Sequence, residues 1–299
     1  MAPPPATNSR TARTRSAIGA SLRQFARSRT AVLGLVIFVA MVLVSVFAPY
    51  FATHPPRQIV PAERLQSPSK GHLLGTDNLG RDVFSRVVYG GRTSLAIAAV
   101  VVVITGTVGT ALGLVSGFYR RIDNVLMRFM DGLMAIPTLL LAIALIGVLG
   151  PNSVNLVIAL SIVYVPRVAR IARATTLQVR GLSYVEAAQA LGGMDARLLF
   201  RHIAPNALGP INVQLTFVFA YAVLSEASLS FLGVGAPPET PTWGNILSEG
   251  RAYMILAPWI SFYPGVAIML TVLGLNLMGD GLRDLLDPRL KRGTGGGAG

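Results

Sequence analysis

The chain has 299 residues, of which 52% are hydrophobic and 13% are charged, and its net charge is +13. This balance excludes a single soluble domain and is typical of a chain solvated mainly by lipid. The sequence contains no cysteine, which excludes disulfides and thiolate metal sites. A positive charge of this size can indicate a nucleic acid partner, but the charge is distributed as in membrane proteins, so none is expected.

Apolar windows long enough to cross a membrane follow one another along the chain. A transmembrane helix needs about 20 apolar residues to cross about 30 Å of hydrocarbon. Windows without Asp, Glu, Lys or Arg cover residues 31–53, 93–119, 132–166, 207–225 and 252–279. The third window is long enough for two crossings and is divided by turn-forming residues at 149–153. The sequence therefore predicts an all-α membrane protein with six transmembrane helices.

The first window could also be read as a cleaved signal peptide. Its apolar core is longer than the usual 7–15 residues, and Ala-Thr-His-Pro-Pro at 52–56 is a poor cleavage site. We therefore expect a retained helix. The segment before it contains no acidic residue but holds Arg10, Arg13, Arg15, Arg23, Arg27 and Arg29. This bias places the N-terminus in the cytoplasm, and six crossings return the C-terminus to the same side.

Composition divides the chain into four regions. Residues 1–24, rich in Pro, Thr, Ser and Arg, are predicted to form a disordered basic N-terminus. Residues 25–92 hold the first transmembrane helix and an extracytoplasmic loop. Residues 93–292 form a five-helix core with a cytoplasmic loop at 174–206, and residues 293–299 (GTGGGAG) form a flexible tail.

Charged residues gather before the second window. Their spacing predicts ion pairs along a helix that begins near residue 78 or 79. They are Asp77, Arg81, Asp82, Arg86 and Arg92. An interfacial helix that fixes the second span is the favoured interpretation, and a contact with a partner protein is the alternative. At the start of the third span, Asp131 is expected to pair with Arg128.

The polar stretch 183–206 lies between two apolar windows. Ser183 and Glu186 match a capping box at the start of a helix. Gly192, followed by a second glycine, supplies the positive φ that ends a helix. Asp195 is a suitable N-cap for a second helix over 196–202, which Pro205 would stop. The stretch therefore predicts two short helices joined by a glycine hinge, with small residues that let another protein approach closely.

A second interpretation of this stretch is an amphipathic helix pair on the membrane surface, in which Glu186 only caps its helix. Arg197 and Arg201 would then contact anionic lipid. These residues by themselves leave a protein partner and lipid equally open.

Polar residues within the windows are candidates for a transport path. Glu226 lies near the outer end of the fifth span, where an ionisable residue indicates function by default. The competing interpretation pairs it with Arg92 or Arg251 at the interface. The neutral candidates are Asn155, Gln214 and Asn276. Each is more typical of an interhelical hydrogen bond, worth about 0.6–2 kcal/mol, than of a pathway lining.

Catalytic and nucleotide-binding patterns are missing from the sequence. It has no G-x-x-x-x-G-K-[ST] phosphate loop and no nucleophile–base pair, and His54, His72 and His202 are scattered. The chain is therefore expected to bind no cofactor or metal, not to be an enzyme, and to take its energy from another subunit.

Glu186-Ala187-Ala188, followed by Gly192 and closing at Pro205, resembles the EAA loop of ATP-binding cassette (ABC) importer permeases. In that family the loop forms a coupling helix that docks into a groove on a cytoplasmic ATPase. The resemblance implies a coupling loop at 174–206 with coupling roles for Ser183, Tyr184, Glu186, Ala187, Ala188, Leu191 and Gly192. This chain has Ala204 where the family commonly has Leu before the closing proline.

Further segments narrow the resemblance. Residues 74–86 (LGTDNLGRDVFSR), 90–95 (GGRTSL), 224–233 (LSEASLSFLG) and 279–290 (GDGLRDLLDPRL) resemble dipeptide and oligopeptide permeases of the DppC/OppC type. The resemblance covers about residues 25–292. It implies a type I ABC importer fold with six helices and both termini cytoplasmic, in the bacterial inner membrane.

The resemblance also implies partners and a substrate class. The partners are a second homologous permease subunit, two cytoplasmic ATPases that use ATP and Mg, and an extracytoplasmic binding protein that delivers peptides. Nickel, glutathione or another solute is the alternative substrate within the family. An ion-coupled secondary transporter and a non-transporting membrane scaffold are the alternatives from other classes.

Overall fold

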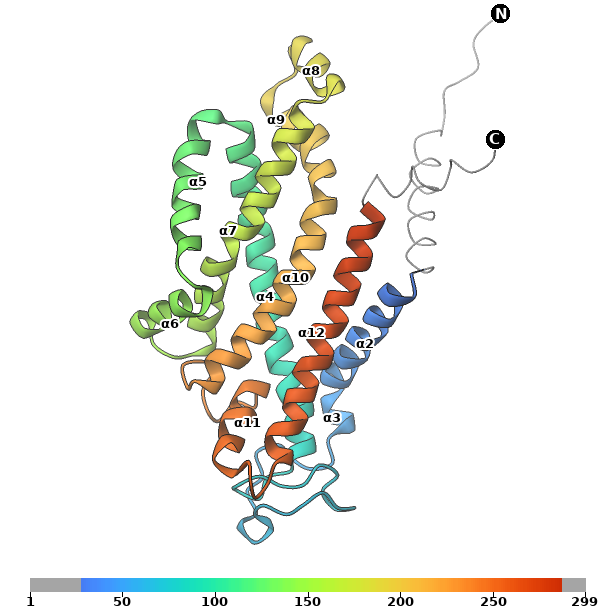
Figure 1. Ribbon diagram of the computed structural model, residues 1–299, viewed down its shortest axis with the longest axis vertical. Coiled ribbons are helices and arrows are strands. Elements are labelled where there is room, and N and C mark those ends of the chain that lie inside the picture. Colours follow the sequence, from blue (N-terminus) through green and yellow to red (C-terminus); the bar gives the residue numbers. More distant parts are fainter. Residues whose placement is uncertain (1–27, 287–299) are drawn as a thin grey trace, which may run out of the picture.

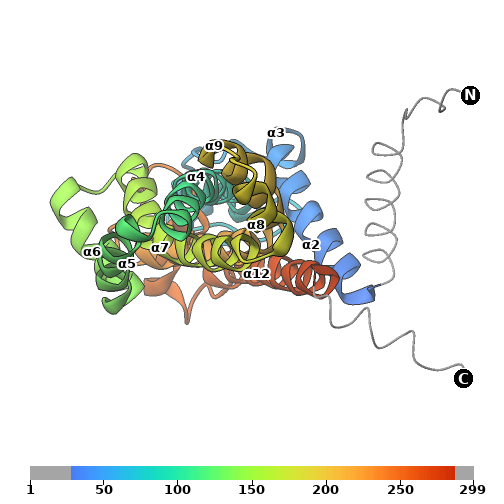
Figure 2. The same cartoon turned by 90° about the horizontal axis from the view of Figure 1, so that it is seen from above.

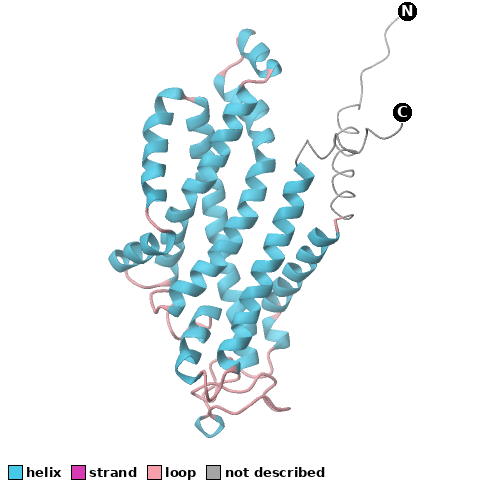
Figure 3. Ribbon diagram, viewed as in Figure 1, coloured by secondary structure: helices cyan, strands magenta, loops and turns pink. Residues whose placement is uncertain are grey.

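A computed structural model describes residues 28–286, and this part of the chain is helical apart from its connecting loops (Figure 1, Figure 3). Within it, strand-like pairing is limited to an isolated β-bridge between Thr76 and Asp82. The all-helical prediction is confirmed for the described residues. The regions predicted at 1–24 and 293–299 lie outside them.

Five helices are long and apolar enough to cross a membrane. They are α2 (Arg29–Val46), α4 (Val83–Phe118), α7 (Ser153–Arg180), α10 (Ala204–Phe231) and α12 (Trp259–Leu286). A sixth crossing is obtained if α5 (Arg120–Ala135) and α6 (Thr138–Leu149) count as one bent span. The shorter helices are α3 (Ala48–Phe51), η1 (Pro61–Glu63), α8 (Ser183–Ala190), α9 (Asp195–Arg197), η2 (Leu198–Ile203), α11 (Trp243–Gly250) and η3 (Arg251–Tyr253).

The third crossing, predicted between residue 132 and the turn at 149–153, is not one continuous helix. Helix α5 ends at Ala135, Ile136 is extended at φ −89° and ψ 132°, and the chain turns by 95° before α6. Pro137 accounts for the break, because proline lacks an N–H and disfavours helical backbone at the residue before it. The 12 residues of α6 span about 18 Å, which is short of about 30 Å of hydrocarbon.

The second crossing begins later than residue 78 or 79, so that prediction is wrong. Helix α4 starts at Val83, and its N-cap is Asp82, whose carboxylate accepts the Ser85 N–H at 2.8 Å. Asp77 accepts the N–H groups of Leu79 and Arg81 at 2.8 and 3.0 Å, which holds residues 77–81 in a turn. A carboxylate that satisfies its own following backbone in this way competes with helix formation.

Helices α4 and α7 pack closely along their length (Figure 1). Gly109, Gly113 and Gly117 lie four residues apart on the face of α4 that meets α7. A Cβ added at Gly113 would come within 2.5 Å of the Ala172 Cβ, so the two backbones meet where side chains are missing. Small residues at this spacing are the usual means of close helix contact in membranes.

The bundle has two distinct ends and two edges. Helix α8 stands at one end, and the loop of residues 52–82 with α11 lies at the other (Figure 1). Seen from above, α5 and α6 lie at one edge and α2 with α12 at the opposite edge (Figure 2). Helices α2 and α12 pack against each other, so the first and last described crossings are neighbours.

Candidate functional site

Helix α8 begins differently from the predicted capping box. Its N-cap is Leu182, at φ −82° and ψ 137°, and no side chain caps the helix. The Leu182 carbonyl accepts the N–H groups of Val185 and Glu186 at 2.8 and 3.1 Å. Ser183 is therefore the first residue inside the helix, and the capping role assigned to its hydroxyl is wrong.

The end of α8 matches the expectation from the paired glycines. Gly192 has φ +76°, and its N–H donates to the Gln189 carbonyl at 3.0 Å. The Gly193 N–H donates to the Ala188 carbonyl at 3.0 Å. These two bonds together form a Schellman motif, the common left-handed ending of a helix.

The second helix of the module is longer than predicted. Its N-cap is Met194 rather than Asp195, and Pro205 does not end it. Helices α9, η2 and α10 form one helical run from Asp195 to Phe231. Pro205 lies in the first turn of α10, after the wide π-helical turns of η2, so its missing N–H does not interrupt the run.

One buried side chain holds α8 against the bundle. Val185 is 1% exposed and belongs to the same apolar core as Leu198 and Ile203. The Asn206 amide also donates to the Tyr184 hydroxyl at 3.2 Å. Of the residues assigned to coupling, Ala188 is half-buried and the exposed ones are Ser183, Tyr184, Glu186, Ala187, Leu191 and Gly192. The predicted set therefore does share one exposed module.

Large apolar side chains are exposed beside α8. Leu191 is 88% exposed, Met194 69% and Phe200 70%. Large apolar side chains exposed on a protruding module are typical of an interaction surface. The Glu186 carboxylate lies on the same module and makes no ion pair with any described residue.

Glu226 is enclosed within this chain. It is 0% exposed on α10, and its carboxylate accepts the Ser230 hydroxyl at 2.9 Å. The hydroxyls of Ser94 on α4 and Thr242 before α11 lie near it. The ion pair with Arg92 or Arg251, which was the competing interpretation, does not form: Arg92 is exposed, and Arg251 lies over the Phe231 ring at 5.7 Å.

The structure does not bring the four pathway candidates together. Asn155 lies in the first turn of α7, and its amide donates to the carbonyls of Leu149 and Gly150 before that helix, at 2.6 and 3.0 Å. Gln214 and Asn276 are half-buried on α10 and α12. Gln214 lies about 18 Å along α10 from Glu226, so the two are not part of one site.

Asp131 pairs with a different arginine from the one predicted. It accepts from Arg170 of α7 at 2.6 Å, not from Arg128 on its own helix. The pair is half-exposed and connects α5 to α7. Arg173 of α7 also donates two hydrogen bonds, of 2.5 and 2.6 Å, to the Asp123 carboxylate of α5.

A buried ion network lies at the other end of the molecule. The sequence predicted some of its members but not all of them. Asp77 accepts from Arg81 at 2.6 Å and from Arg86 at 2.5 Å. Both arginines also donate to Glu249 of α11, at 2.5 and 2.6 Å. Arg86 is 2% exposed and Asp77 0%. The network therefore fixes the start of α4 to α11, in agreement with the favoured interpretation. Its acceptor on α11, Glu249, was not indicated by the spacing of charges in the sequence.

The neighbouring Asp82 is also enclosed. Its burial raises the pKa of the carboxyl, but hydrogen bonds from the Ser85 N–H, His72, the Ser85 hydroxyl and Thr53 together leave the pKa lowered. The carboxylate therefore stays charged at the start of α4, where the helix dipole favours a negative charge.

Comparison with known proteins identifies the family. Residues 109–292 match the binding-protein-dependent transport system inner membrane component family, and residues 16–68 match the N-terminal transmembrane domain of oligopeptide transport permease C. The chain belongs to this family of inner membrane components. The permease is thus a multi-pass membrane protein and a transport component, as its apolar helices indicated.

Its relatives are similar over nearly their whole length. A Brucella suis protein named as a peptide transport system permease is 47% identical over 277 residues, covering 93% of this permease and 94% of the relative. The dipeptide transport system permease protein of Alkalihalophilus pseudofirmus is 43% identical, with coverage of 91% and 90%. The glutathione transport system permease protein of Pectobacterium atrosepticum is 41% identical, with 90% and 90%.

Proposed function

We propose that this permease is one membrane subunit of an ATP-driven ABC importer that takes up dipeptides or oligopeptides. Helix α8 is its coupling helix and faces the cytoplasm, and the loop of residues 52–82 with α11 faces outward. The observation that carries the proposal is the structure of α8. It is a short helix that ends at a glycine motif, is anchored by the buried Val185 and is otherwise largely exposed.

The anchoring of α8 allows movement at its surface to reach the spans. Val185 packs in the same core as Leu198 and Ile203, and these two residues belong to the helical run that continues into α10. A force on α8 therefore acts directly on a crossing helix. At its N-terminal end, α8 is connected to α7 by a two-residue turn. A displacement of α8 would therefore act on both α7 and α10.

The proposed partners follow from two features: the sequence has no phosphate loop, and apolar side chains are exposed near α8. The sequence has no phosphate loop, so two cytoplasmic ATPases would bind ATP and Mg and dock on α8 through its exposed apolar side chains. A second homologous permease would complete the path, and lipid would cover the remaining apolar faces. A binding protein would deliver the substrate at the end that carries α11.

Among the pathway candidates, Gln214 and Asn276 are the better supported because they are half-buried and thus reachable from outside the chain. Glu226 would line a path only after α11 moved away from α10, since it is fully enclosed. The peptide substrate rests on the names of the relatives. Nickel or another solute is distinguished by identifying the ligand that the associated binding protein carries.

Deleting residues 187–192 tests the coupling role. We expect peptide uptake and co-purification with the ATPases to be lost while membrane insertion persists. Because a deletion can disturb folding, Glu186→Arg provides a milder test, with Glu239→Arg, exposed at the opposite end, as the matched control for ATPase binding. A deleted form that still binds its ATPases and transports would refute the assignment, and uptake driven by an ion gradient without ATP would indicate a secondary transporter.

A further inference from the structure

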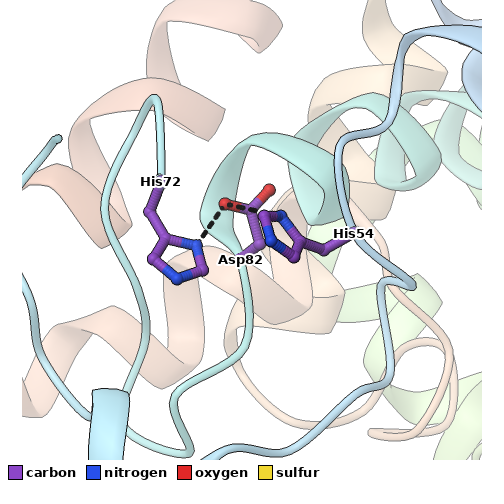
Figure 4. Close-up of side chains that lie close together, drawn as sticks. All are labelled: His54, His72 and Asp82. Carbon is purple, nitrogen blue, oxygen red and sulfur yellow. Dashed lines mark hydrogen bonds and ion pairs between the residues drawn. The ribbon is translucent and has the colours of Figure 1, made fainter. Parts of the chain in front are cut away.

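Two of the three histidines of the chain meet at the start of α4. His54 follows α3, His72 lies in the loop after η1, and Asp82 is the N-cap of α4 (Figure 4). One ligand atom from each of these residues lies within 4.8 Å of the other two. Asp82 is 2% and His72 7% exposed, whereas His54 is partly open to solvent.

The ligand atoms are close to the spacing that a metal ion requires. The His72 Nδ1 lies 2.9 Å and the His54 Nδ1 3.9 Å from the Asp82 Oδ1. Four-coordinate zinc, with bonds of about 2.0–2.2 Å, holds its ligand atoms roughly 3.3 Å apart. The His54 Nδ1 also lies 3.1 Å from the Thr53 hydroxyl oxygen, and a rotation of this partly exposed ring away from Thr53 would close the remaining gap.

His72 is held as metal-binding histidines are held. Its Nε2 lies 3.2 Å from the Glu63 Oε2, while its Nδ1 faces Asp82. A neutral imidazole has one N–H and cannot donate to both carboxylates. A metal ion at Nδ1 removes this conflict, because Nε2–H then donates to Glu63. A carboxylate behind the ligating histidine is the usual companion of such sites.

The other oxygen of Asp82 is already occupied. Its Oδ2 accepts the Ser85 N–H at 2.8 Å and the Thr53 hydroxyl at 3.2 Å. These bonds fix the carboxylate so that Oδ1 points toward both imidazole rings (Figure 4). The carboxylate can therefore serve as an N-cap and as a metal ligand at once.

We propose that His54, His72 and Asp82 bind a divalent transition-metal ion, with Glu63 orienting His72. Two imidazoles and one carboxylate favour Zn²⁺ and its neighbours over Mg²⁺ or Ca²⁺, which prefer oxygen ligands. The ion would join the segment after α3 to the first turn of α4 and fix the outer loop between them. The expectation of no metal rested on the separation of the histidines along the sequence. The fold brings His54 and His72 close together in space.

Zinc titration of the full chain tests this site. The chain is purified through a histidine-free affinity tag, stripped with chelator and titrated with Zn²⁺ against a chromogenic competitor. We expect one zinc per chain, a higher Tm with zinc, and with Co²⁺ the visible absorption of a low-symmetry site. His54→Gln should lower zinc affinity by about tenfold or more, and Glu63→Gln by about tenfold.

His202→Gln is the matched control, because His202 lies beside α8 at the other end of the bundle. It should leave zinc affinity unchanged. Equal zinc affinity in His54→Gln and the unmodified chain would overturn the proposal. An absence of one-to-one binding together with an unchanged Tm would also overturn it. Gel filtration of each variant confirms that the loss is not due to unfolding.

Discussion

The two ends of the molecule treat charged side chains in opposite ways. At the α11 end, Asp77 and Arg86 are buried and paired with each other, and Arg86 also donates to Glu249. At the α8 end, Glu186 is exposed and makes no ion pair with any described residue, and the apolar Leu191 is exposed beside it. Charges satisfied within the chain hold its own elements together, whereas those left open are available to another molecule. Substitutions at the first end should therefore reduce stability, and those at the second should reduce association.

The largest expected effect is at the buried network. Asp77→Ala should lower the free energy of unfolding by about 3–5 kcal/mol, because it removes one of the two acceptors of the buried Arg86 and of the half-buried Arg81. Thermal denaturation in detergent measures the loss. Glu239→Ala, at an exposed position of the same end, should change stability by less than about 0.5 kcal/mol. Equal losses in the two variants would show that the network does not hold this end together.

Two glycines with nearly the same φ sharpen the comparison. Gly80 has φ +75° and Gly192 has φ +76°, but a Cβ at Gly80 would collide with the Val60 carbonyl, while nothing lies within 4 Å at Gly192. Gly80→Ala should cost about 3 kcal/mol, from left-handed strain plus overpacking, and Gly192→Ala about 1–2 kcal/mol from strain alone. Paired melting curves test the order, and a larger loss at Gly192 would contradict it.

The smallest stability effect is expected at Glu186. Glu186→Gln removes a charge but no bond within the described chain, so the free energy of unfolding should change by less than about 0.5 kcal/mol. Its effect should be on association, measured as weaker binding of the ATPases at equal membrane levels. A clear drop in Tm with unchanged ATPase binding would assign Glu186 to the fold of its own chain.

The sequence predicted the five long crossings because apolar length is a local property, and it predicted the end of α8 because paired glycines have a local backbone effect. It did not place boundaries where neighbours compete. Ser183 matched the pattern of an N-cap, but the N-cap of α8 is Leu182. Helix α4 begins later than predicted because Asp77 holds the preceding residues in a turn. The break between α5 and α6 lies at Pro137, so its cause is also a local property of the sequence.

Long-range partners left no such signal. Glu249 lies 168 residues from Arg81, and no pattern along one sequence connects them. The contact between His54 and His72 likewise depends on the path of the loop between α3 and α4. In contrast, the glycines at 109, 113 and 117 had a recognisable four-residue spacing, which indicates close helix packing.

The uninterrupted helical run from Asp195 to Phe231 makes α10 a lever. Its 37 residues extend over about 55 Å, so a tilt of about 5° around its midpoint displaces each end by roughly 2 Å in opposite directions. A small push near α8 would thus reach the α11 end as a movement of comparable size and opposite sense.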